Sequence, residues 1–413
     1  MDKKKKDAYE ELCKDLKLCP RLIPFPLWSY SIANLVRIET RIIEAIKEGY
    51  SRIIDETKNW WFSLARKGKC EVCGDLIEDG EIDEEWLYYV NEENSSGVAY
   101  LNKIRLICKN CHLAKHQGYA KVINKSEEAL KYFAKINELS IHEAKMLVNS
   151  AFNIHSNLNK IREWSFKIKL KGFHNKEVEE LLELLYKGKY ILEGDWLYYY
   201  NPRYYEEVEP KIIEETLHTL NSIKRRTSKQ EFINSLLEFI KKFLKRYGIE
   251  VLEKEFKYFM NLILEPTIFK KYSDYYPDVL DIESLMENII QHKNIKITTI
   301  PSLLKGKWFL FTSPENCPTL FINIINRLKD EKIAYEGKIH AFNKNYNKSE
   351  LPVFIYVPSS FALDTIARVV EIMKEELSKK GLTKRIYFKP DIFTDQRIYS
   401  SDKGLKSYIY YIK

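Results

Sequence analysis

Two Cys-x-x-Cys pairs constrain the fold of this chain more than any other feature of its sequence. They read CEVC at residues 70–73 and CKNC at residues 108–111. Each pair can give two thiolates to a metal, and two such pairs suit one tetrahedral zinc ion. The alternative, four reduced thiols in an ordinary core, is disfavoured by the repeated spacing. We therefore predict a structural Zn²⁺ site formed by Cys70, Cys73, Cys108 and Cys111.

The 34 residues between the two pairs exceed the usual gap, which predicts a hairpin or loop inserted between them. Zinc would add on the order of 10 kcal/mol to the folding of a segment with little core of its own. The other cysteines, Cys13, Cys19 and Cys317, show no ligand spacing and are expected to be ordinary thiols.

Length and patterning predict a multidomain α+β protein of 413 residues. We expect a charged lead-in over 1–20, a zinc-stapled ββα and helical domain over 21–172, a helical connector over 173–299, and an α+β domain over 300–413. The last expectation rests on short β-rich runs, such as KITTIPSL and KWFLFTS, that alternate with two helical patterns.

Helix start signals are clearest after the second cysteine pair. Residues 126–155 read as two helices, with Ser126 as the N-cap of the first. Ser140 and Glu143 predict a capping box for the second. The sequence Trp-Leu-Tyr-Tyr-x-Asn occurs at 86–91 and again at 196–201 without matching flanks, which indicates at most a shared strand preference.

Composition excludes a membrane-spanning protein. No apolar run approaches the roughly 18 residues that a span needs, and the basic start lacks the apolar region of a secretory signal. The expectation is a cytoplasmic protein without a membrane partner. Abundant Lys, Glu and Ile with only four Gln are typical of thermophiles, although AT-rich coding produces the same bias.

Two histidines follow the second cysteine pair directly. His112 and His116 are four residues apart and would share one face of a helix. There they could hold a second divalent ion, Mg²⁺ or Mn²⁺, against a scissile phosphate, with a general base from the hairpin. The alternative is a pair of histidines that only make local hydrogen bonds.

These residues resemble HNH endonucleases of the ββα-metal type, in particular a bacterial and archaeal branch. That branch reads Trp-x-x-Asn-Leu, Cys-x-x-Cys, His-Glu-x-Trp-x-Tyr and Leu-Cys-x-x-Cys-His-x-x-Lys-His-x-Gly. Here WSYSIANL is an approximate version of the first element, and CEVCG and LICKNCHLAKHQGYA match closely. The resemblance covers about residues 20–170 and implies a metal-dependent nuclease.

The chain departs from this pattern on the hairpin. Asp83, in DEEW, stands where the branch has the histidine of His-Glu-x-Trp. Aspartate, with a reference pKa of about 3.9, is a poorer base near neutral pH, but it still binds Mg²⁺ or Mn²⁺. Asp83, His112 and His116 are therefore the candidate catalytic residues, with altered or lost cleavage expected.

The charge pattern around the cysteines bears on nucleic-acid binding, which a mild net charge of +8 permits without requiring. Residues 75–93 carry nine acidic side chains and no basic ones, whereas 101–125 carry six Lys or Arg and no acids. The acidic hairpin is a poor surface for phosphates. Contacts to DNA or RNA would therefore fall to Lys103, Arg105, Lys109, Lys115 and Lys121. A binding module, an active nuclease and a purely structural domain all remain open.

Basic and aromatic residues are interleaved in the C-terminal part. Lys307, Lys389 and Arg397, near aromatic residues such as Trp308 and Phe388, suit a pocket for a phosphate or nucleotide. The alternative is that the aromatics form the core and the lysines are solvated.

The C-terminal segment resembles a family that carries the label phosphothreonine lyase domain. The match is good at Gly306, Lys307, Trp308 and in YFKPDIFT, over about residues 300–413. The resemblance implies a fold similar to the mRNA cap-binding translation initiation factor. It also implies a second hypothesis of function, in which the protein is a phosphate-directed enzyme or binder. A third hypothesis is a scaffold in which both domains have lost their chemistry.

Overall fold

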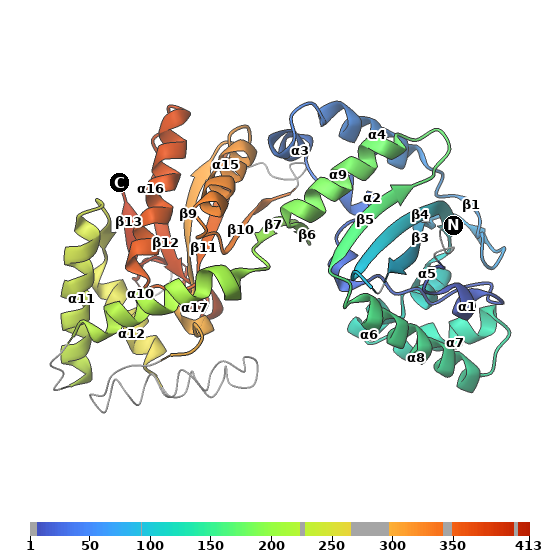
Figure 1. Ribbon diagram of the computed structural model, residues 1–413, viewed down its shortest axis with the longest axis horizontal. Coiled ribbons are helices and arrows are strands. Elements are labelled where there is room, and N and C mark those ends of the chain that lie inside the picture. The colour runs from blue at the N-terminus through green and yellow to red at the C-terminus, as the bar shows by residue number, and fades with distance from the viewer. Residues whose placement is uncertain (1–5, 92, 224–227, 266–296, 342–348, 400–403) are drawn as a thin grey trace. The chain divides into compact units, whose positions relative to one another are not determined.

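A computed structural model describes residues 6–91, 93–223, 228–265, 297–341, 349–399 and 404–413. The chain divides into two compact units, Met1–Leu192 and Glu193–Lys413. Both combine helices with sheets, as Figure 1 shows, so the α+β class is confirmed. Each unit is described by itself below.

The first unit is built around a three-stranded sheet of β3 (Glu81–Asn91), β4 (Ser96–Ile107) and β5 (Glu163–Ile168). β3 and β4 form an antiparallel hairpin with an irregularity between Glu85 and Trp86, and β5 runs parallel to β4. This hairpin fills the gap between the cysteine pairs, as predicted. Gly97 in β4 leaves room for Trp164, whose ring a Cβ would approach within 2.5 Å.

Helices of different lengths surround this sheet. In chain order they are α1 (Glu10–Cys13), η1 (Phe25–Leu27), α2 (Ile32–Leu35), α3 (Thr40–Ile46), α4 (Ser51–Ser63), α5 (Lys109–Lys115), α6 (Gln117–Val122), α7 (Ser126–Ile136), α8 (Ile141–Leu158) and α9 (Asn175–Gly188). A small ribbon of β1 (Gly68–Lys69) and β2 (Leu76–Ile77) carries the first cysteine pair between its strands.

The helices after the second cysteine pair form a core of their own. Phe133 and Ala134 of α7 pack with Ala144 and Val148 of α8 and with Ala114 of α5. The capping box of α8 is confirmed, because the Ser140 hydroxyl accepts from the Glu143 N–H and the Glu143 carboxylate accepts from the Ser140 N–H. The Ser126 prediction is wrong: Lys125 is the N-cap position and Ser126 is already helical.

The second unit contains an eight-stranded sheet in the order β6-β7-β10-β11-β9-β12-β13-β8. Its strands are β6 (Tyr190–Glu193), which spans the junction between the units, β7 (Trp196–Tyr200), β8 (Glu250–Val251), β9 (Gly306–Thr312), β10 (Glu336–His340), β11 (Leu351–Val357), β12 (Ile386–Pro390) and β13 (Tyr410–Ile412). The pairs from β7 to β8 along this order are all antiparallel.

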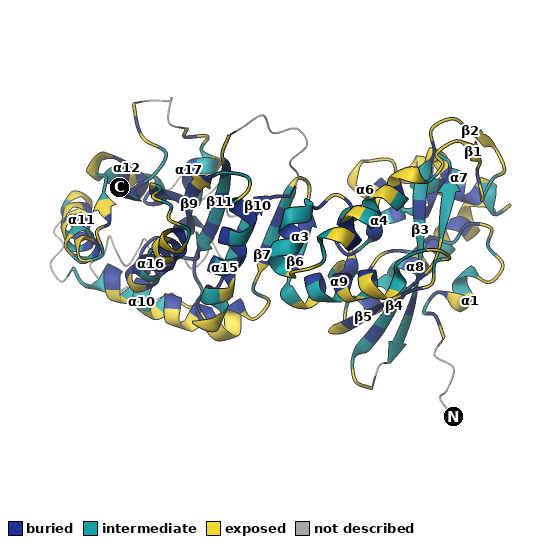
Figure 2. Ribbon diagram, turned by 90° about the horizontal axis from the view of Figure 1, so that it is seen from above, coloured by how far each residue is buried: buried dark blue, intermediate teal, exposed yellow. Residues whose placement is uncertain are grey.

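The helices of this unit are η2 (Tyr204–Val208), α10 (Glu209–Asn221), α11 (Lys229–Lys245), α12 (Glu253–Ile263), η3 (Ser302–Leu304), α15 (Cys317–Asp330), α16 (Leu363–Lys379) and α17 (Asp391–Asp395). α15 and α16 pack on one face of the sheet, where the Trp308 indole donates to the Ile366 carbonyl at 3.1 Å. Figure 2 shows buried residues along the central strands and exposed ones on α10 and α11.

The division into domains differs from the expected one. The stretch assigned to a helical connector is split, since α9 belongs to the first unit and β7 pairs with β10 in the second. Four aromatic residues in WLYYY favour a sheet strand for β7. The part of the connector at 266–296 lies outside the described residues. KITTIPSL forms no strand over its described residues, because Pro301 precedes a 3₁₀ turn.

The structure also joins Cys13 and Cys19 in a disulfide, where ordinary thiols were expected. Both copies of Trp-Leu-Tyr-Tyr lie in strands, β3 and β7, which explains the repeat by strand preference. Among the described helices none is long and apolar enough to cross a membrane.

Candidate metal centre

The four paired cysteines form one cluster. Cys70 and Cys73 lie in the turn after β1, Cys108 is the N-cap of α5, and Cys111 is in its first turn. The Sγ atoms of Cys70 and Cys111 are 3.7 Å apart, and those of Cys73 and Cys108 are 3.8 Å apart. Zinc at about 2.3 Å from four tetrahedral sulfurs separates them by about 3.8 Å. The cluster therefore fits a tetrahedral metal ion.

Backbone groups already point at these sulfurs. Cys70 Sγ accepts from the N–H groups of Cys73 at 3.5 Å and Cys108 at 3.4 Å. Burial acts to raise the pKa of Cys70, but these N–H donors lower it to about 7. Burial raises the pKa of Cys111. A cation would supply the charge that keeps all four sulfurs as thiolates.

Asp83 of β3, His112 of α5 and His116 at the C-cap of α5 form a second cluster. One ligand atom from each lies within 4.8 Å of the others. The centres of the two imidazole rings are 4.5 Å apart in an edge-to-face arrangement, and His116 Nε2 is 3.9 Å from Asp83 Oδ1. The structure thus brings together the three candidate catalytic residues.

Asp83 is held by two cations. Lys115 Nζ donates to Asp83 Oδ1 at 2.5 Å, and Arg105 donates to Asp83 Oδ2 at 2.8 Å. Arg105 also pairs with Glu85 at 3.0 Å. Burial acts to raise the pKa of Asp83, but Lys115 and Arg105 together hold it below the usual value. Asp83 is therefore ionised, neutralised and a poor general base.

The two histidines are neutral near pH 7. Partial burial lowers the pKa of His116 to about 3, and the charges of Lys115 and His112 act in the same direction. Burial also lowers the pKa of His112. Neutral imidazoles with a nearby carboxylate are suitable ligands for a divalent ion, but a metal here would compete with Lys115 and Arg105 for Asp83.

The five basic residues predicted to contact nucleic acid differ in exposure and in the partners that they already have. Lys103 and Lys121 are exposed. Lys109 is exposed but pairs with Asp79 at 2.7 Å. Arg105 is engaged by Asp83 and Glu85, and Lys115 is buried to 3% exposure. Lys115 cannot reach a phosphate on the surface, because its ammonium group is enclosed with Asp83.

The predicted phosphate pocket of the second unit is only partly assembled. A pocket of about 370 Å³ is lined by Lys305, Lys307 and Lys338, which lie beside Tyr335 and Tyr356. Lys307 pairs with Asp391 at 2.7 Å.

Lys389 and Arg397 do not line this pocket. Lys389 is buried and donates to the Ile398 carbonyl at 3.2 Å, and burial and Lys307 lower its pKa to about 8. Arg397 is exposed in a left-handed turn with φ 52°.

Sequence reasoning missed residues that alternation along a strand could have found. Lys305 precedes Lys307 by two positions and thus falls on the same side of an extended chain. In the first unit, Trp60, Lys169 and Lys171 line a groove with Lys103 and Arg105. No local motif marks them, because they come from α4 and from the segment after β5.

No family model matches the sequence, and no curated protein matches it.

Proposed function

We propose that this chain is a nucleic-acid-binding protein whose first unit is a zinc-stapled, HNH-like module. The observation that carries the proposal is the arrangement of two ligand sets on one ββα segment. The four cysteines gather at the start of α5, and Asp83, His112 and His116 gather between the hairpin and the same helix. This is the order of parts that the HNH resemblance implies. Zn²⁺ occupies the cysteines in this proposal.

The module binds more readily than it cleaves. A general base must be able to accept a proton, and Asp83 is already neutralised by Lys115 and Arg105. A catalytic Mg²⁺ or Mn²⁺ would have to share the Asp83 carboxylate with those two cations. We therefore expect any nuclease activity to be weak.

Metal analysis of the purified protein tests the proposal. We expect one tightly held zinc per chain, and its absence would contradict the zinc-stapled module. Plasmid nicking with Mg²⁺ or Mn²⁺ tests the second cluster. Nicking that disappears in His116→Ala but persists in His142→Ala, a change at an exposed position of α8, would assign activity to it. Nicking that survives His116→Ala would refute that assignment.

A second candidate function rests on the pocket of the second unit, and is a phosphate- or nucleotide-directed binder or enzyme. Within the pocket, Lys307 Nζ lies 4.9 Å from the centre of the Tyr356 ring and Lys305 Nζ lies 5.5 Å from that of Tyr335. Burial, with the charge of Asp391, raises the pKa of Glu336 to about 6, so this carboxyl can donate or accept near neutral pH. Cations, aromatic rings and a titratable acid together suit a phosphorylated ligand with a flat ring.

Calorimetry with nucleotides and phosphopeptides would test this candidate. The full chain is required, because β7 and β8 lie outside 300–413 but belong to the same sheet. Lys338→Gln should weaken binding, whereas Lys374→Gln, at an exposed position of α16, should not. Equal binding by both variants would contradict it.

A further inference from the structure

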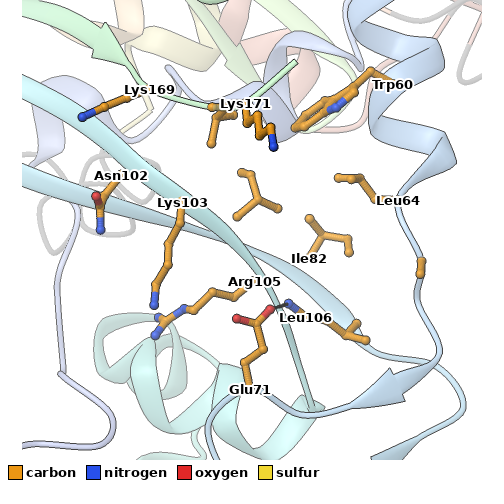
Figure 3. Close-up of a pocket in the computed structure, with 13 residues that line it drawn as sticks. Trp60, Leu64, Glu71, Ile82, Asn102, Lys103, Arg105, Leu106, Lys169 and Lys171 are labelled. Atoms are coloured by element: carbon orange, nitrogen blue, oxygen red, sulfur yellow. Dashed lines mark hydrogen bonds between the residues drawn. The ribbon is translucent and has the colours of Figure 1, made fainter. Parts of the chain in front are cut away.

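A groove of about 500 Å³ borders the second cluster of the first unit (Figure 3). Its apolar lining includes Leu64 from the end of α4, Ile82 of β3 and Ile104 of β4. Arg105 lines the same groove and contacts Asp83. The groove therefore continues toward the candidate metal ligands, with Arg105 between the two.

The groove exists because two strands part. β5 follows β4 only as far as Leu101, whose carbonyl accepts from the Lys169 N–H at 3.2 Å. Beyond that point the chain of 169–171 diverges from β4, which leaves the edge of β4 without a strand partner among the described residues.

The next peptide groups along this edge are partly occupied. The Leu106 N–H donates to the Glu71 carboxylate at 2.9 Å, and the Leu106 carbonyl accepts from the Glu71 N–H at 3.0 Å. Because peptide groups alternate in direction along a strand, those of Ile104 also face away from β3, into the groove.

Positive charge is concentrated along this groove. Lys103, Lys169 and Lys171 are exposed, and within the described part of the chain none of their ammonium groups has a hydrogen-bond or ion-pair partner. Figure 3 places Lys103 on one side, and Lys169 and Lys171 across the groove from it. The acid in the lining, Glu71, already accepts from Leu106. The groove thus offers three free cations to an anionic ligand.

An aromatic ring stands beside these cations. Trp60 is half-buried at the end of the groove near Lys171, and its ring packs against Phe173 with centres 4.4 Å apart. Phe173 fixes the orientation of the indole from one side. Within a duplex the faces of a base are covered by its neighbours, so only an unpaired base can stack on such a ring.

We propose that this groove binds an unpaired strand of nucleic acid. The three lysines contact successive phosphates, Trp60 stacks on a base, and the strand leads past Arg105 toward Asp83. This inference rests on the proposed function, and it narrows the substrate from nucleic acid in general to single-stranded segments or ends.

An acidic peptide added as a strand to β4 fits the groove less well. Strand addition needs a run of alternate residues with open peptide groups. Leu101 and Leu106 are already bonded to Lys169 and Glu71, which leaves Ile104 as the open position between them. A nucleic-acid strand needs no such run, because its contacts are charge and stacking.

Fluorescence anisotropy of the full chain tests the proposal, with labelled oligo-dT and oligo-U of about 20 nucleotides and a duplex of the same length. The titrations contain no added Mg²⁺ or Mn²⁺. We expect tighter binding of the single strands than of the duplex.

Trp60→Ala should weaken single-strand binding by about tenfold to a hundredfold, as for loss of one stacked base. Trp60→Phe should retain most of it. The triple change Lys103→Gln, Lys169→Gln and Lys171→Gln should lower the slope of log K against log salt by about 2, since each phosphate contact contributes about 0.7.

The matched control replaces three other lysines of the first unit that lie outside the groove, Lys14, Lys47 and Lys145, by Gln. Binding that changes equally in the control would overturn the proposal. Tighter binding of the duplex than of the single strands, with no change in Trp60→Ala, would also overturn it. So would displacement of the strand by a poly-glutamate peptide, if the Trp60 variants bind the strand as tightly as the wild type does. If the full chain binds neither single strands nor duplex, the proposed function itself fails, whereas binding that ignores the groove variants refutes only this inference.

Discussion

The two ligand sets that meet at α5 differ in the groups that surround them. In the cysteine set, Cys70 Sγ and Cys108 Sγ accept from backbone N–H groups, which favour thiolates without neutralising them. Asp83 of the other set is enclosed with two full positive charges, Lys115 and Arg105. Two sets that look equally dense in the sequence thus differ in their capacity for a cation. The difference teaches that residue type marks a possible ligand, while the neighbouring charges decide what it can hold.

The largest effect should follow from breaking the cysteine set. Cys70→Ser removes one of four ligands, and a zinc site of this kind contributes on the order of 10 kcal/mol to folding. We expect the first unit to lose cooperative unfolding and zinc content together. Circular dichroism melts with parallel metal analysis would check this.

Cys317→Ser is the control for that change, because Cys317 is also buried but lies in the second unit outside the cluster. A Cys70→Ser protein that melts like the Cys317→Ser protein would show that the cluster holds no structural metal.

A smaller loss of folding stability should follow when acid protonates His116 of the second set. The folded pKa of His116, about 3, lies below the usual value of about 6.5. The unfolded state therefore takes up the proton first, and stability is lost as pH falls from about 6.5 toward 3, by up to about 5 kcal/mol. His116→Gln should remove this part of the pH dependence.

Urea unfolding between pH 7 and pH 5 would measure it as the difference between wild type and His116→Gln. Loss of zinc at low pH affects both proteins alike and cancels in that difference. His142→Gln, at an exposed position, should leave the wild-type curve unchanged. Parallel curves for wild type and His116→Gln would mean that His116 does not resist protonation.

Lys115→Met tests whether the cations beside Asp83 are what limits metal binding at the second set. It removes one partner of a buried ion pair, which costs about 3–5 kcal/mol. It also frees one oxygen of Asp83, so Mn²⁺ should bind more tightly at the second set. Urea unfolding and electron paramagnetic resonance of added Mn²⁺ measure the two effects.

Lys109→Met, which breaks the exposed pair with Asp79, should change stability by no more than about 1 kcal/mol and leave Mn²⁺ binding as it was. Unchanged Mn²⁺ binding in Lys115→Met would show that the cations do not control the site.

The sequence predicted the parts whose signals are local. Spacing alone placed the four cysteines together, and the pattern Ser140 to Glu143 marked the start of α8. The substitution of Asp83 for the expected histidine was also visible. These features depend on residues a few positions apart or on a motif of fixed spacing.

What could not be predicted depends on contacts between distant segments. Arg105 reaches Asp83 because the two are direct partners in the β3–β4 register, and Lys115 reaches it from α5. In the sequence alone, the basic residues of 101–125 were predicted to contact phosphates. β7 was missed for a similar reason, since its partner strand β10 lies more than a hundred residues further along the chain.

The smallest expected effect concerns a neighbour of the cysteine set. The Tyr132 hydroxyl lies 3.9 Å from Cys108 Sγ, a long contact to a weak acceptor. Tyr132→Phe keeps the ring in the α7 packing and removes only this contact. We expect zinc affinity, measured by competition with a chromogenic chelator, to fall by less than about tenfold, which is the lower limit for loss of a well-placed partner of a metal ligand. A larger loss would show that the cysteine set also depends on its surroundings, and the contrast with Asp83 would then be one of degree.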